Sequence, residues 1–198
     1  KEARKEHILK AARTLLLKKG LHATTVNQIA RLSELSVGTI YLYYHNKEDI
    51  FAALQEEGLT MLNDLIAKAV AAASSPKDKI RAVALGYLEF SEKQKNYYDI
   101  ITYFLSTPEQ LFPPRLKNRV DRTGGKILGF CIEAIEAGIK SGDFRKVNAR
   151  RHTIWLWGML HGLIQFRKME KTILQKESYG TLVQYALENY LKTLVAEK

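Results

Sequence analysis

Residues 25–50, TVNQIARLSELSVGTIYLYYHNKEDI, carry the most specific pattern of this 198-residue chain. Thr25 followed three positions later by Gln28 is a capping box, which predicts that a short helix begins there. A turn near residues 33–35 precedes a second short helix, expected over roughly 37–44. The stretch therefore predicts two short helices joined by a tight turn.

The two short helices have the composition that a close crossing requires. Ile29 and Ala30 are expected to face inward, and the small Ala30 lets the next helix approach closely. This is helix-turn-helix geometry. The second helix then exposes short or unbranched side chains, with donors suited to phosphate around them. The exposed set is Ser36, Val37, Gly38, Thr39 and Leu42, and the donors are Thr25, Thr39, Tyr41, Tyr43, His45 and Lys47.

Outside this stretch the apolar residues also follow a helical period, so the predicted fold class is all-α with about nine helices. Pro76, Pro108, Pro113 and Pro114 mark the breaks between helices in the middle of the chain. The expected helices are a first over 5–19, the two short ones, a long fourth from about Asn46 to 73, and then roughly 77–95, 96–106, 114–141, 147–170 and 177–196.

Composition excludes several classes of protein. Hydrophobic residues make up 46% of the chain, the net charge is +10, and no apolar run approaches the roughly 20 residues of a membrane span. The first residues, Lys1-Glu2-Ala3-Arg4-Lys5, contain no apolar stretch of signal-peptide type, and because they lack Met we expect a short leader to precede them. A single cysteine, Cys131, gives no disulfide framework, and the histidines show no ligand spacing. We expect a soluble cytoplasmic protein with no metal, no cofactor and no catalytic site.

The quoted stretch resembles the tetracycline-repressor (TetR) family of bacterial transcription regulators, over about residues 5–55. The family pattern is roughly T-x-x-x-I-A-x-x-A-G-V-S-x-G-T-L-Y-x-Y-F-x-[SN]-K-E-x-L. Matching residues are Thr25, Ile29, Ala30, Ser36, Gly38, Thr39, Tyr41, Tyr43, Asn46, Lys47 and Glu48, with Ile40, Tyr44 and Ile50 as close substitutes. The chain departs from the family at Ser33-Glu34-Leu35, where Ala-Gly-Val is usual. Glycine accepts a positive φ cheaply, whereas Glu34 in the same conformation costs about 1 kcal/mol and brings a negative charge near the DNA face.

The resemblance implies a role for each matched residue. Val37, Gly38, Thr39 and Leu42 would face base edges in the major groove, beside the exposed Ser36. The phosphate contacts would come from Thr25, Tyr41, Tyr43, His45 and Lys47. Because no Arg, Asn or Gln lies on this face, readout would depend on Thr39, on thymine methyl groups and on DNA shape.

The resemblance also divides the chain into a DNA-binding domain over residues 1–50 and a ligand-binding and dimerisation domain over 51–198. An apolar or amphipathic effector would be lined by Tyr97, Tyr98, Ile101, Tyr103, Phe104, Ile127, Phe130, Trp155 and Met159, for which core packing is the alternative. Arg115, Lys117, Arg119, Arg122 and Lys126 hint more weakly at an anionic head group.

The expected helix over 147–170 is apolar on all sides, which predicts a partner subunit. The resemblance implies a homodimer through the last two helices, and the predicted interface is Trp157, His161, Ile164, Leu182, Ala186, Tyr190 and Leu194. A dimer would place two reading helices in successive major grooves of a near-palindromic operator. The function expected is that of a sequence-specific repressor released by a small ligand. The alternatives are a ligand-free or activating regulator, an all-α enzyme, or a basic helical adaptor at a membrane surface.

Overall fold

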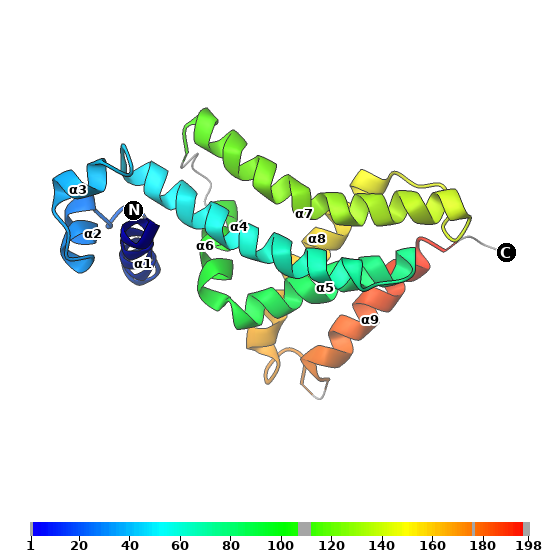
Figure 1. Cartoon of the computed structure of the whole chain (residues 1–198). Helices are drawn as coiled ribbons and strands as arrows, with labels where there is room; N and C mark the ends of the chain where they lie inside the picture. The colour runs from blue at the N-terminus through cyan, green and yellow to red at the C-terminus, as the bar shows by residue number, and fades with distance from the viewer. Residues whose placement is uncertain (1, 107–111, 176, 196–198) are drawn as a thin grey trace. The chain divides into compact units, whose positions relative to one another are not determined.

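The computed structural model describes residues 2–106, 112–175 and 177–195, and over these residues the chain is all-α, as predicted (Figure 1). The α-helices in chain order are α1 (Glu2–Lys19), α2 (Val26–Leu32), α3 (Val37–Tyr41), α4 (Lys47–Ala71), α5 (Pro76–Lys93), α6 (Lys95–Ser106), α7 (Pro114–Ser141), α8 (Ala149–Phe166) and α9 (Tyr179–Lys192). A short 3₁₀ turn, Arg167–Met169, follows α8.

Most helix ends lie within a few residues of the prediction, because caps and prolines act locally. The third helix is shorter than expected and ends at Tyr41, since the amide of Leu42 bonds to the Thr39 carbonyl and the chain turns. Helix α8 ends at Phe166 rather than near 170. The predicted break at Pro108 lies outside the described residues.

The described residues pack as two compact units. The first contains residues up to 61 together with those between 94 and 124, and the second contains 62–93 and the residues from 125 onward. The predicted DNA-binding segment, 1–50, lies wholly in the first unit, which also holds α6. These units describe packing, so the functional boundary at residue 50 stays a prediction.

In the first unit, α1 packs on α2 and on α6 through one apolar face. The buried residues of that face are Ile8, Ala11, Ala12, Leu15 and Leu16. Two polar contacts join α1 and the turn that follows it to α6: Arg13 of α1 donates a hydrogen bond to the Tyr97 hydroxyl, and the amide of Leu21 in the turn donates to the Tyr103 hydroxyl at 3.4 Å. Helix α6 is thus held against the N-terminal helices.

The turn between α2 and α3 contains a residue in the left-handed region. Glu34 has φ 56°, and the amide of the next residue, Leu35, donates to the Ala30 carbonyl at 2.9 Å. A positive φ is therefore kept at the position where the TetR pattern has glycine, although a glutamate side chain is strained there.

In the second unit, α8 packs on α5 and α9, and a tight contact closes the end of α7. A Cβ placed on Gly138 would overlap the Phe144 ring, which is itself buried. The Phe144 amide also donates to the Gly138 carbonyl at 3.0 Å. The absence of a side chain at 138 therefore lets the following turn fold back on the helix.

The substitution Gly138→Ala is expected to destabilise the second unit by roughly 1–2 kcal/mol, because the Phe144 ring must leave its position. Gly129→Ala in the same helix is the matched control, since a Cβ there meets nothing within 4 Å. The control should stabilise by up to about 1 kcal/mol through helix propensity. Urea denaturation of the two variants measures the difference, and equal stabilities would contradict the packing argument.

Candidate nucleic-acid interface

Helix α2 begins with the predicted capping box. The Gln28 amide donates to the Thr25 hydroxyl at 3.2 Å, and the Thr25 amide donates to Gln28 Oε1 at 3.3 Å. Ile29 and Ala30 are buried, as predicted. The two reciprocal bonds fix where α2 starts, and burial fixes which of its faces points inward.

Helix α3 is held in the same way. Ser36 is its N-cap, accepting from the Thr39 amide at 3.0 Å, and the hydroxyls of Ser36 and Thr39 lie 2.8 Å apart. Ile40 is fully buried and anchors the inward face of the helix. Because Ile40 points inward, the opposite side of this five-residue helix is turned to solvent.

The solvent-facing side of α3 and of the residue after it carries both small polar and larger apolar side chains. Leu42 is 81% exposed and Tyr41 is 50% exposed. Ser36 and Gly38 are exposed, while Val37 and Thr39 are half-buried. A Cβ on Gly38 would meet only the Ser36 hydroxyl, at 3.8 Å, so a partner can approach the backbone closely here.

The predicted phosphate donors around this helix differ in how exposed their side chains are. Thr25 and His45 are exposed and Tyr43 is half-buried. Lys47 is also half-buried, and its ammonium group donates to the Leu21 carbonyl at 3.2 Å. An ammonium has three donors, so this bond positions the lysine and leaves it able to meet a phosphate.

Two backbone amides at the start of α4 are bonded to side chains of the same segment. The Asp49 amide donates to Asn46 Oδ1 at 2.8 Å, and the His45 amide donates to Asp49 Oδ2 at 3.2 Å. Backbone donors that a phosphate would use are therefore already bonded to side chains of the chain. Phosphate binding at this point would depend on Lys47 rather than on the helix terminus alone.

Tyr44 lies in the stretch between α3 and α4 and is half-buried. Burial, followed by the nearby Glu57 carboxylate, raises the pKa of its phenol to about 12. Tyr44 therefore stays a neutral phenol at physiological pH and supports the turn before α4.

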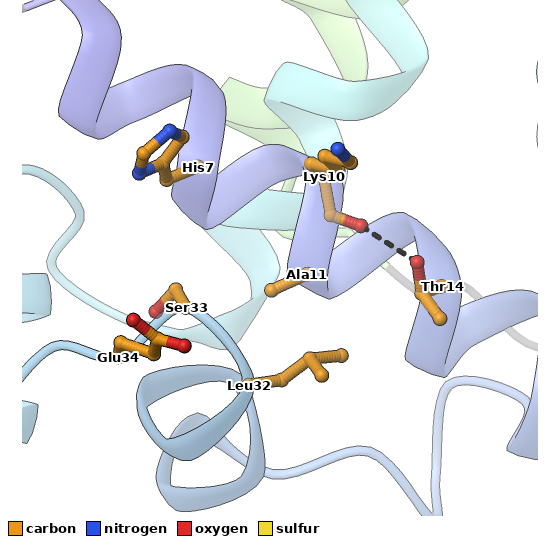
Figure 2. Close-up of a pocket in the computed structure, with 7 residues that line it drawn as sticks. All are labelled: His7, Lys10, Ala11, Thr14, Leu32, Ser33 and Glu34. Atoms are coloured by element: carbon orange, nitrogen blue, oxygen red, sulfur yellow. Dashed lines mark hydrogen bonds between the residues drawn. The ribbon is translucent and has the colours of Figure 1, made fainter.

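A groove of about 330 Å³ lies between α1 and the turn that follows α2 (Figure 2). One wall is formed by side chains of α1 and the other by the end of α2 and the turn. The lining residues are His7, Lys10, Ala11, Thr14, Leu32, Ser33 and Glu34. None of these residues was predicted from the sequence to belong to a site. The spacing of His7, Lys10 and Thr14 does place all three on one face of α1.

The residues predicted to line an effector site are divided between the two units. In the first, Tyr97, Tyr98 and Ile101 are buried, and Phe104 stacks on Phe112 with ring centroids 4.6 Å apart. Tyr103 and Phe104 are half-buried. In the second unit Ile127 is buried, Phe130 and Met159 are half-buried, and Trp155 is 50% exposed.

The predicted dimer interface needs correction at three residues. Ile164, Tyr190 and Leu194 are buried within the chain, so their side chains have no surface to offer a partner. Their apolar character serves the core in which α5, α8 and α9 meet. Trp157, His161, Leu182 and Ala186 are half-buried and remain candidates. The large exposed apolar residues of α8 and α9 are Ile154, Trp155, Phe166 and Tyr185. The helical spacing of apolar residues in the sequence does not distinguish these exposed positions from the buried ones.

The basic residues of α7 give little support to an anionic head group on the ligand, because several of them pair with acidic side chains. Arg115 lies 4.0 Å from Asp49, Arg119 pairs with Glu56, and Lys117 pairs with Asp121. Three of the five basic residues of α7 thus have acidic partners within the chain.

Other kinds of site find no support in the described part of the chain. Cys131 is buried, and burial raises the pKa of its thiol to about 11, so it stays protonated. Residues 2–106, 112–175 and 177–195 contain no group of three or more potential metal ligands. None of the helices described there has the length and apolar character needed to cross a bilayer.

Comparison with known proteins agrees with this geometry. The model of the family "Bacterial regulatory proteins, tetR family" matches residues 8–54. The HTH-type transcriptional regulator YhgD of Bacillus subtilis is 27% identical over 91% of this chain and 93% of its own length. The fatty acid metabolism regulator protein of Bacillus subtilis is 24% identical over 70% of each chain.

Among solved structures, the transcriptional regulator FadR of Bacillus subtilis in complex with stearoyl-CoA superimposes with a TM-score of 0.78 at 21% identity. The match covers 96% of this chain and 98% of that one, so the fold is shared over its whole length. Residues 8–54 therefore carry the helix-turn-helix of the tetR family of bacterial regulatory proteins, built by its own caps, and the chain as a whole has the same helical fold as the FadR structure.

Proposed function

We propose that the protein is a repressor that binds a near-palindromic operator as a homodimer and is released by a small apolar or amphipathic effector. The observation that carries the DNA-binding part is α3, whose Ile40 is fully buried while Gly38 and Leu42 face solvent. A short helix whose buried face anchors it to the domain, and whose exposed face carries little side-chain bulk, suits insertion into a major groove.

Within this interface the residues divide by chemistry. Val37, Gly38, Thr39 and Leu42 would contact base edges, and Ser36 would hold α3 in register. Hydroxyl, imidazole and ammonium donors at Thr25, Tyr41, Tyr43, His45 and Lys47 would contact phosphates. Because the Ser36 and Thr39 hydroxyls already bond to each other, apolar contact and DNA shape would contribute much of the sequence preference.

The dimer is supported by the exposed apolar face of α8. Ile154 is 48% exposed and Trp155 is 50% exposed, and Gly158 and Gly162 continue the same side of the helix. A Cβ on either glycine would meet nothing within 4 Å, so packing inside the chain does not require them. Glycines on an exposed apolar helix face allow a second helix to approach closely. A second copy of this chain is the partner that fits.

The effector is supported by the buried aromatic residues of α6 and by the related FadR, whose structure holds stearoyl-CoA. Helix α4 is one continuous helix from Lys47 to Ala71, so it connects the reading segment to the bundle. An effector that binds one arrangement of α4 more tightly would change the separation of the two reading helices. As a DNA-binding regulator the protein would act in the cytoplasm, without catalytic activity.

Selection of bound duplexes from a random pool should return a near-palindromic consensus with half-sites about 34–36 Å apart.

Lys47→Ala should weaken binding to all sequences, since a phosphate contact is lost. It should also reduce the slope of log affinity against log salt concentration by about 1. Tyr43→Phe should act in the same direction. Thr39→Ala should instead change the preferred sequence, at a cost of about 1 kcal/mol for the original site.

Lys140→Ala is the control for the loss of one positive charge, because Lys140 is an exposed residue of α7 in the second unit. It should leave affinity nearly unchanged. Vesicle binding without preference among duplexes would favour the adaptor hypothesis and contradict the regulator.

Gly158→Leu should convert the dimer to a monomer, because a leucine side chain blocks close approach of the partner helix. Gly125→Leu is the matched control on α7, where a Cβ also meets nothing within 4 Å. Sedimentation velocity measures both variants. A Gly158→Leu protein that remains dimeric would show that this face is not the interface.

Stearoyl-CoA, used as a probe, should release the protein from its selected operator in a mobility-shift titration. Coenzyme A without the acyl chain is the control and should have no effect, because the apolar chain supplies the buried area. Unchanged DNA affinity at saturating stearoyl-CoA would exclude long-chain acyl thioesters as the effector.

A further inference from the structure

Glu34 combines a strained backbone with an exposed negative charge in a DNA-binding domain. Its backbone lies in the left-handed region with φ 56°, its side chain is exposed, and it carries a negative charge. Residues held in sparsely populated backbone regions often serve a function, because the surrounding structure must maintain the strain. Glycine would remove both the strain and the charge at this point.

The position of Glu34 brings its charge within range of bound DNA. It lies two residues before Ser36, the exposed N-cap of the reading helix α3. Two residues of chain span at most about 7 Å, which is less than the Debye length of about 8 Å at physiological ionic strength. The phosphates that flank α3 would therefore experience the Glu34 charge with incomplete screening.

The groove shown in Figure 2 gives this charge a second effect. Glu34 lines one wall of the groove, and His7 and Lys10 of α1 line the other. Among the described residues no ion pair within 4.0 Å is formed by the Glu34 carboxylate, so it acts through the local field and not by a fixed contact. It lowers the positive potential that Lys10 gives to this side of the domain.

We propose that Glu34 is a negative determinant of DNA affinity, which weakens phosphate binding to every duplex and leaves base recognition to α3. The inference rests on the proposed function, since it requires α3 to be the reading helix. Non-specific binding is almost entirely electrostatic, so a fixed carboxylate beside the reading helix shortens the time spent on unrelated DNA. The regulator then depends more on its apolar and shape-dependent contacts.

Glu34→Gln tests the charge while keeping the side-chain size. The glutamine is accommodated in this conformation, because Gln175 of the same chain already has φ 52°. The variant should bind both the selected operator and an unrelated duplex about three- to tenfold more tightly at low salt, with a steeper salt dependence and little gain at high salt. The ratio of the two affinities should stay unchanged.

Two further variants make the result specific. Glu136→Gln removes one negative charge from an exposed position of α7 in the second unit and should change neither affinity. Lys10→Gln removes a positive charge from the opposite wall of the groove and should weaken binding to both duplexes. Thermal melts of all variants establish that each is folded.

Each outcome decides between explanations. If Glu34→Gln binds like the unmodified protein, or no better than Glu136→Gln, the proposal is wrong. If Glu34→Gln changes the preferred base at one position, Glu34 reads a base and is not a general determinant of affinity. If the unmodified protein binds no duplex at all, the proposed function itself fails, and this inference fails with it.

Discussion

The burial of Ile29 on α2 and of Ile40 on α3 is the constraint on which the rest of the interface depends. Both side chains are fully buried, and the small Ala30 next to Ile29 is buried as well. Neither helix is long enough to be stable alone, so their faces are set by this burial and by the caps at Thr25 and Ser36. Once Ile40 points inward, the side of α3 with Gly38 and Leu42 must face outward. The chemistry available to DNA follows from that single orientation.

A second contact ties this interface to α6. Arg13 of α1 donates to the Tyr97 hydroxyl, and its guanidinium lies 4.7 Å from the Tyr97 ring centroid. Burial and then the Glu57 carboxylate raise the pKa of Tyr97 to about 12, so its hydroxyl remains protonated between the cation and the anion. Gly58 of α4 lies against the same ring, where an added Cβ would be 3.1 Å away. Helices α1, α4 and α6 therefore share one tyrosine, and a displacement of α6 cannot leave α1 unaffected.

The second unit shows a different division between core and surface. Tyr190 donates from its hydroxyl to the His152 carbonyl at 2.9 Å, and its ring lies 5.3 Å from that of Trp155. Tyr190 is buried, yet half of Trp155 is exposed. An aromatic pair with one buried and one exposed member marks the edge of the chain's own core. The apolar surface beyond that edge, on α8 and α9, is the part that a second copy would cover.

The amino-acid sequence determined the features that depend on neighbours within a few residues. The capping box at Thr25, the fold class and the helix order could be predicted because backbone hydrogen bonds and the helical period act locally. Even the strain at Glu34 could be anticipated from a glycine position in the family pattern, and its positive φ confirms it.

Tertiary structure alone decided which apolar side chains remain exposed and can contact another molecule. Ile164 and Tyr190 follow the same helical period as exposed residues of their helices, and Leu194 lies just after α9, yet all three are buried. The groove between His7, Lys10 and Glu34, and the membership of α6 in the first unit, join residues far apart in the chain. A periodic pattern shows that a helix has an apolar face but not which neighbour covers it, because that choice is made by packing between distant segments.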